Sequence, residues 1–239
     1  MNNLLEFTIK AHGGLTHWNK FKNVSAHLNV DGMTWVRKQQ PGILKDVNVS
    51  VEIEQQLVSF QSKDQKWKTF FDSQRIAAET DEGKSIEELL NPRQSFEGHT
   101  RETPWSRLQA FYFASYAIWI YFNAPFCFAH PDYEVTEIEP WEENGETFRR
   151  LQVTFPDYLV THSRIQTFYI DKAGLIRRHD YNVEISENAA GAHYLYDYEE
   201  IQGIKFPTRR QVFIRNQDNT TIQPEPVLVL IDLSEITLK

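Results

Sequence analysis

The chain has 239 residues, of which 41 % are hydrophobic and 13 % aromatic, and its formal net charge is −8. A chain of this length can bury a core without staples, and its one cysteine, Cys127, excludes an intrachain disulfide and a multi-cysteine zinc site. Because no cluster of lysine and arginine stands out, nucleic acid is not an expected partner.

Residues 1–14 predict a short helix that ends at a pair of glycines. Leu4, Leu5 and Ile9 lie on one side of it, and Gly13 and Gly14 follow. The segment lacks the basic and apolar regions of a signal peptide. We therefore expect a cytoplasmic protein, or a periplasmic one if a leader has been removed.

Alternating apolar and polar residues then predict half-buried strands over residues 23–32 and 47–62. Residues 66–71 and 75–80 continue the same pattern as a meander. The pattern changes near Ser85, which has Glu88 three residues later, the spacing of a capping box. We expect a short helix there, closed by Pro92.

The central stretch, residues 108–129, contains no charged residue. Thr103 and Pro104 suit the start of a helix and Pro125 its end, which predicts a helix over about residues 104–123. The length is that of a membrane span, but aromatic residues fill its middle, whereas spans hold Trp and Tyr at their ends. A helix that is apolar on every side is buried on every side, and we expect it inside a strongly curved sheet of a soluble protein.

Two interpretations of this helix remain open. It either forms the core itself, or helix and sheet leave a cavity between them that holds an apolar ligand. In the second case the lining would come from aromatic residues of the helix and from polar and aromatic residues of later strands: Phe111, Tyr112, Tyr116, Trp119, Phe122, Arg177, His179, Tyr181, Tyr194 and Tyr196.

From residue 133 onward strands return, with turn-rich connections. They are expected over residues 133–141, 148–155, 162–170, 175–185, 192–201, 208–215 and 227–238. With no linker or repeat, residues 1–239 read as one α+β domain built on a long antiparallel sheet.

The turn at residues 171–174 suits a bulged hairpin. Beyond it we expect paired residue numbers to sum to about 346, as in Gln166 with Asp180 and Thr167 with His179. In this register His162 faces Glu184 on a solvated face, opposite to His179, so the two histidines would not share a metal with His193. His179 would be either a ligand contact or a hydrogen-bonded core residue.

The common nucleophile, zinc and nucleotide motifs are absent from the sequence, and no cofactor or metal is expected. Residues 11–30, 168–181 and 198–210 resemble the opening, the hairpin and a later strand of proteins in the lipoprotein-localisation-factor (LolA-like) superfamily. Residues 96–126 and 161–181 also resemble a set of uncharacterised bacterial proteins. The resemblance implies an open antiparallel half-barrel with helices on its concave side and an apolar cavity, which carriers of that superfamily use for acyl chains.

The leading interpretation is a non-enzymatic binder or carrier of an apolar or amphipathic, lipid-like small molecule. An enzyme with a site near His179 and Arg177, and a protein with a filled core and a partner-binding surface, are the alternatives. The sequence leaves the oligomeric state open.

Overall fold

The computed structural model describes residues 2–62, 67–80 and 82–239. Its helical elements are α1 (Asn3–Ala11), α2 (Leu15–Trp18), α3 (Met33–Arg37), α4 (Arg107–Asn123) and the 3-10 turns η1 (Pro92–Phe96), η2 (Phe126–Ala129) and η3 (Glu184–Ser186). Its strands are β1 (Asn23–Asp31), β2 (Val47–Glu52), β3 (Val58–Ser62), β4 (Trp67–Phe71), β5 (Arg75–Thr80), β6 (Ser85–Leu90), β7 (Glu134–Glu143), β8 (Glu146–Thr154), β9 (Ile165–Ile170), β10 (Ile176–Val183), β11 (Ala189–Ile201), β12 (Ile204–Arg215), β13 (Thr221–Ile222) and β14 (Val229–Leu238).

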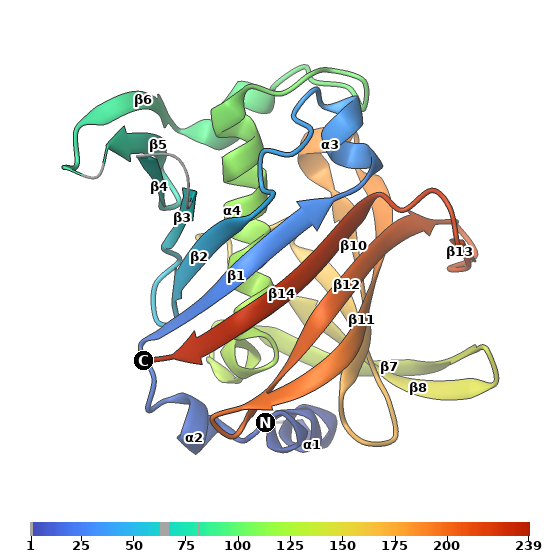
Figure 1. Cartoon of the computed structure of the whole chain (residues 1–239). Coiled ribbons are helices and arrows are strands. Elements are labelled where there is room, and N and C mark those ends of the chain that lie inside the picture. The colour runs from blue at the N-terminus through green and yellow to red at the C-terminus, as the bar shows by residue number, and fades with distance from the viewer. Residues whose placement is uncertain (1, 63–66, 81) are drawn as a thin grey trace.

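The described strands form one antiparallel sheet, which confirms the predicted sheet (Figure 1). Its order is β6-β5-β4-β3-β2-β1-β14-β12-β11-β10-β9-β8-β7, with β13 paired to β12. The sheet does not close, because β6 and β7 occupy its two ends. The first and last long strands, β1 and β14, pair with each other near the middle.

The alternation in the sequence decides which way the first strands face. In β1 every second residue from Val24 to Val30 is buried, and β2 repeats the pattern from Val47 to Val51. These side chains all lie on one face of the sheet because successive strand residues point to opposite faces.

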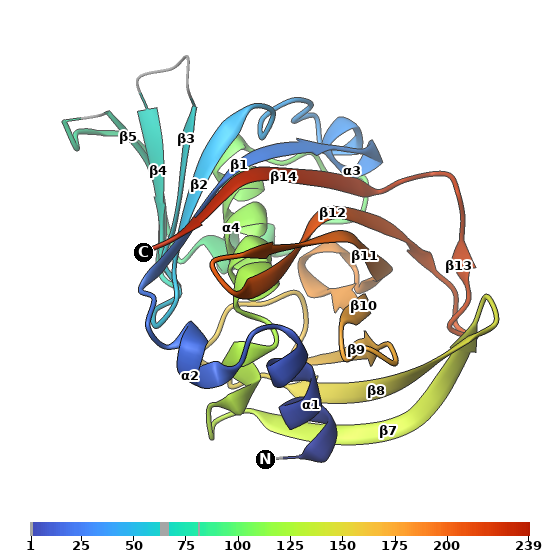
Figure 2. The ribbon, with the colours of Figure 1, turned by 60° about the horizontal axis from the view of Figure 1, so that its bottom comes forward.

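That face curves around α4, as the view along the curve shows (Figure 2). Sixteen residues of α4 are buried, from Leu108 to Asn123. The helix begins at Arg107, three residues later than predicted. The Ser106 hydroxyl accepts from the backbone N–H of Gln109, and the Gln109 side chain accepts from the backbone N–H of Ser106, so the capping box lies there and not at Thr103.

No helix in the described parts of the chain has both the length and the apolar character that crossing a membrane requires.

The predicted helix at Ser85 is wrong. Residues Ser85–Leu90 form the edge strand β6, in which Leu89 pairs with Ile76 of β5. The local capping-box signal gives way to backbone pairing with a neighbouring strand, since tertiary contacts override weak local preference. The strand predicted over residues 66–71 begins with Lys66, which lies outside the described residues.

The predicted hairpin register holds for one pair only. Ile170 faces Ile176, whose numbers sum as expected, but a second irregularity in β10 shifts every later pair by one residue. His179 therefore faces Phe168, and Thr167 faces Asp180. The prediction placed the only bulge in the turn, and the extra one within β10 leaves no mark in the alternation of the sequence.

At the glycine pair after α1, the chain passes very close to another turn. Gly13 has a φ of +122°, and a Cβ built on it would lie 2.3 Å from the carbonyl oxygen of Gly203. Its neighbour Gly14 also has a positive φ, +87°, but has open space around it. Comparing the two glycines therefore distinguishes the effect of a positive φ, which both share, from the effect of steric contact, which only Gly13 has.

We expect Gly13→Ala to destabilise the protein more than Gly14→Ala. Both variants bear the cost of holding alanine at a positive φ, about 1–2 kcal/mol. Only in Gly13→Ala does the new Cβ also push the backbone of Gly203 away. Urea unfolding of the two variants beside the parent measures the difference. Equal losses would show that α1 can move away from Gly203 without cost.

Candidate functional site

Along most of its length α4 is solid core. The Phe111 ring packs against Phe60 and Trp67, with ring centroids 5.9 and 5.3 Å apart. The next residue, Tyr112, packs against Phe71 with ring centroids 5.8 Å apart. In the N-terminal half of α4, aromatic side chains therefore fill the space between the helix and the sheet.

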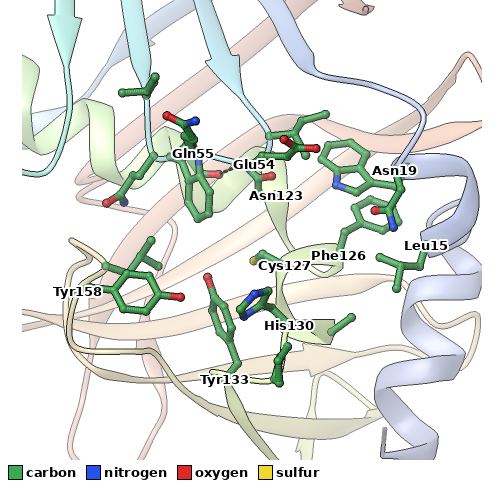
Figure 3. A pocket seen from close by; sticks show the side chains of 18 of the residues that line it. Leu15, Asn19, Glu54, Gln55, Asn123, Phe126, Cys127, His130, Tyr133 and Tyr158 are labelled. Atoms are coloured by element: carbon green, nitrogen blue, oxygen red, sulfur yellow. Dashed lines mark hydrogen bonds between the residues drawn. The ribbon is translucent and has the colours of Figure 1, made fainter.

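A pocket of about 800 Å³ opens at the other end of α4 (Figure 3). Trp119 and Asn123 of α4 form one side of it. The other walls come from segments far apart in the sequence: Leu15, Trp18, Asn19, Ile53, Glu54, Gln55, Gln56, Leu57, Asp72, Ser73, Phe126, Cys127, Ala129, His130, Pro131, Tyr133, Tyr158 and Leu159.

Hydrogen bonds from side chains hold these walls in place. The indole N–H of Trp119 donates to the carbonyl oxygens of Glu52 and Gln55, at 2.8 and 2.7 Å. The Gln56 amide donates to the carbonyl of Val160 and accepts from its N–H, at 2.6 and 3.0 Å. The turn between β2 and β3 is thereby tied both to α4 and to the loop that follows β8.

Aromatic stacking fixes the wall nearest the N-terminus. The rings of Trp18 and Phe126 are stacked, with centroids 4.4 Å apart and planes within 9°. Trp18 is 2 % exposed, and this places α2 and η2 against each other beneath the pocket. Aromatic pairs prefer stacked or edge-to-face arrangements because their π-systems carry a quadrupole, and such a pair adds stability beyond the area it buries.

The thiol in the pocket wall is not a nucleophile at neutral pH. Burial raises the pKa of Cys127 to about 12, so the sulfur keeps its proton. Reactive cysteines need the opposite shift, toward the thiolate. Its role is therefore to line the pocket.

A second, enclosed group of polar rings lies on the other side of α4. The Tyr121 hydroxyl lies 3.2 Å from Nε2 of His162 and 3.1 Å from the Tyr181 hydroxyl. The His193 ring packs against Tyr121 at 4.4 Å, and His179 Nε2 meets the Gln166 side-chain oxygen at 2.5 Å. We call Tyr121, His162, His179, Tyr181 and His193 the histidine–tyrosine cluster.

Burial keeps the histidines of this cluster neutral. It lowers the pKa of His162 to about 3, with Arg93 adding to the effect. It also holds the pKa of His179 and His193 well below the ordinary value, and the charge of Arg210 reinforces both shifts. The solvated His162 expected from the sequence is wrong, since it is 2 % exposed and reaches the same Tyr121 that His179 and His193 pack against.

The cluster has almost no free space. The cavity between His179 and Arg210 measures about 20 Å³, enough for about one water. Arg210 is 2 % exposed and donates to the carbonyl oxygen of Tyr121 at 2.9 Å. Within the described residues no group of three or more histidine, cysteine or acidic side chains is placed to hold a metal ion.

The structure places the predicted ligand residues in several separate parts of the fold. Of the five on α4, Trp119 lines the pocket, whereas Phe122 packs against Phe206 at 5.9 Å. The other three of these residues, all 0 % exposed, lie in the packed interior: Phe111, Tyr112 and Tyr116.

The predicted residues on later strands divide between two faces. His179 and Tyr181 belong to the histidine–tyrosine cluster. Arg177 pairs with Asp171 at 2.7 Å at the hairpin turn. Tyr194 and Tyr196 stack on each other on the outer face of the sheet, in a separate group with Phe213.

Most residues that line the pocket were not anticipated from the sequence. Phe126 and Cys127 follow Pro125 directly, where the uncharged run continues to Ala129 past the end of the helix. This continuation was the one signal in the sequence for these pocket residues, because apolar side chains beyond the helix must also be shielded from water by other parts of the protein. The remaining walls meet only through the fold.

The fold agrees with the resemblance seen in the sequence. The chain superposes on a domain from Vibrio parahaemolyticus described as an outer membrane lipoprotein-sorting protein, with TM-score 0.52, 10 % identity, and coverage of 98 % of this chain and 92 % of the other. A LolA superfamily protein from Nitrosomonas europaea gives TM-score 0.48 at 10 % identity over 92 % and 86 % of the two chains. A DUF1329 family protein from Desulfovibrio piger gives 0.46 at 11 % identity over 98 % and 91 %.

No protein-family model matches the sequence, and no match is found among curated proteins. At 10 % identity the likeness to the Vibrio parahaemolyticus domain shows a shared fold and nothing of the activity.

The pocket wall gives a stability test of the Trp119 hydrogen bonds. We expect Trp119→Phe to destabilise the protein by about 1–2 kcal/mol more than Trp105→Phe, since the former leaves two carbonyls without their donor. Trp105 is a matched control because it is 4 % exposed and its buried indole N–H has no hydrogen-bond partner among the described residues. Urea unfolding measures both losses, and equal values would contradict the anchoring role.

The buried histidines predict a steep loss of stability in acid. Their pKa values in the folded protein, about 4 for His12 and about 3 for His162, lie below the ordinary value of about 6.5, so the unfolded chain binds more protons as the pH falls. Stability is therefore complete above about pH 6.5 and declines below it. With His179 and His193 the slope should approach about 5 kcal/mol per pH unit, at about 1.4 for each group.

Urea unfolding at several values between neutral pH and about pH 5 tests this expectation. His162→Gln should reduce the slope by about a quarter, or about 1.4 kcal/mol per pH unit. A flat stability profile across this range would refute the assignment of neutral buried histidines.

Proposed function

We propose that the protein binds and carries an apolar or amphipathic, lipid-like small molecule in the pocket at the C-terminal end of α4. The observation that carries the proposal is the pocket itself. Its volume of about 800 Å³ falls within the range of about 300–1,000 Å³ typical of small-molecule sites. Trp18, Trp119, Phe126 and Leu159 give it an apolar interior.

The proposed carrier is an open half-barrel with helices on its concave side. In this interpretation α4 fills one end of the curve and stops at Asn123, and the space beyond its last turn is the pocket. Burying apolar surface there is favourable by about 25 cal/mol per Å². A chain-like ligand would therefore be held mainly by the rings of Trp119 and Phe126.

The Vibrio parahaemolyticus domain supports the lipid-like nature of the ligand, because its description names lipoprotein sorting in the outer membrane. The same description favours a periplasmic location over the cytoplasmic one expected from the sequence. The ligand class and the location are both inferred from a shared fold, so they support the proposal less strongly than the pocket does.

We propose no reaction at His179 and Arg177. The space beside His179 is too small for a substrate, and Arg177 is paired with Asp171 on the turn. A catalytic histidine has to reach its substrate within hydrogen-bond distance. The alternative of a protein that acts only through a partner surface is an outcome of the binding test.

Native mass spectrometry of protein purified from cells, followed by extraction with organic solvent, tests for the ligand. We expect a co-purified lipid-like molecule or, after its removal, binding of the apolar fluorescent probe N-phenyl-1-naphthylamine. If several expression hosts yield no bound molecule and the probe does not bind either, the carrier function is overturned. The partner-surface alternative would then remain.

Filling the pocket should abolish binding without unfolding the protein. Leu159→Trp adds ring volume at a half-buried pocket position, and we expect probe affinity to fall by at least about tenfold with little change in stability. Leu90→Trp on the exposed edge strand β6, where Leu90 is 63 % exposed, is the control. Unchanged affinity in Leu159→Trp would place the binding elsewhere.

A further inference from the structure

The charges around the large pocket are of one sign. Among the described lining residues, the formal charges at neutral pH are the carboxylates of Glu54 and Asp72, and no lysine or arginine lines the pocket. His130 also lines it, but its ring lies 3.6 Å from the carboxylate of Asp132, which would match any positive charge that His130 takes up. An anion in the pocket would meet no unmatched cation.

Basic side chains near the pocket are engaged with carboxylates. Lys22 reaches Glu54 at 3.2 Å, in a pair whose side chains are about 70 % exposed, so solvent screens it strongly. Arg75, which follows the lining residue Ser73 by two positions, binds Glu79 at 2.9 Å and also Glu88. Each of these two cations is already paired with a carboxylate, and Lys22 offsets part of the charge of Glu54.

The end of α4 adds a further negative contribution. Trp119 and Asn123 of its last turn line the pocket, and a helix of 17 residues carries partial negative charge at its C-terminus, about half an elementary charge. At this helix end Arg210, which lines the enclosed cavity, donates to the carbonyl oxygen of Tyr121 at 2.9 Å and so offsets part of that negative charge.

Aromatic rings and neutral polar groups supply the remaining lining. The Tyr158 hydroxyl donates to Asp132 at 2.8 Å, which places another carboxylate beside the pocket mouth. The rings of Trp119, Tyr133 and Tyr158 offer faces that attract cations. Asn19, Gln55 and the other amides can bind an uncharged polar group through hydrogen bonds.

We infer that the ligand of this pocket is an amphiphile whose polar end carries no net negative charge. This inference rests on the proposed function and deepens it by naming the class of head group. Burying an anion without a paired cation is costly, and the pocket lining holds two carboxylates and no lysine or arginine to pair with it. A cationic or neutral head group avoids both the cost of burying an unpaired anion and the repulsion by the carboxylates.

A series of amphiphiles with one chain and different heads tests the inference. Dodecyltrimethylammonium, dodecyl maltoside and dodecyl phosphate, each below its micelle concentration, would compete with N-phenyl-1-naphthylamine for the protein. We expect the cationic and neutral compounds to bind at least about tenfold more tightly than the phosphate. Added salt should narrow the gap, because it screens the exposed carboxylates.

The double variant Glu54→Gln, Asp72→Asn should reduce the disadvantage of the phosphate severalfold. Glu199→Gln, an exposed carboxylate on β11 outside the pocket lining, should leave it unchanged. If the phosphate binds the parent protein as tightly as the other two, the charge inference is overturned while the carrier function stands. If none of the three compounds and no probe binds, the carrier function is overturned as well.

Discussion

The structure depends on covering a helix that has no polar side. From Leu108 to Asn123 every residue of α4 is buried, and a helix of this kind is stable in water only inside other protein. A flat sheet covers one side of a helix. A sheet that curves around it covers most of the circumference, and this one has strands enough on either side of β1 and β14 to do so.

The same constraint decides where empty space can exist. Where α4 carries large rings facing strands, as at Phe111 and Tyr112, they fill the interior. Where the helix ends, the turn between β2 and β3, the turn η2 and the loop after β8 form the surroundings. The pocket is thus the part of the curved interior that the helix is too short to occupy, and Trp119 marks the boundary between the two.

Local patterns in the sequence were sufficient for much of the fold and little of the pocket. Alternation in β1 and β2 and the uncharged stretch of α4 depend on neighbouring residues only, and the structure agrees with them. The register of β10 depends on a bulge, and the strand at Ser85 depends on β5, neither of which a short window of sequence contains. The pocket walls meet across more than a hundred positions, as in the contact of Gln56 with Val160, so their residues carry no common pattern to recognise.

The closeness of Gly13 to Gly203 has a consequence for the order in which the chain can assemble. The N-terminal segment is also held there by His17, which meets the carbonyl of Gln202 at 2.7 Å, and by the backbone bond from Lys205 to His12. These partners are separated by some 185 positions, and β1 likewise waits for β14 to complete its pairing. During synthesis on the ribosome, the turn at Gly13 and one edge of β1 thus remain without these partners until Gly203 and β14 have emerged, and such long-range contacts slow folding.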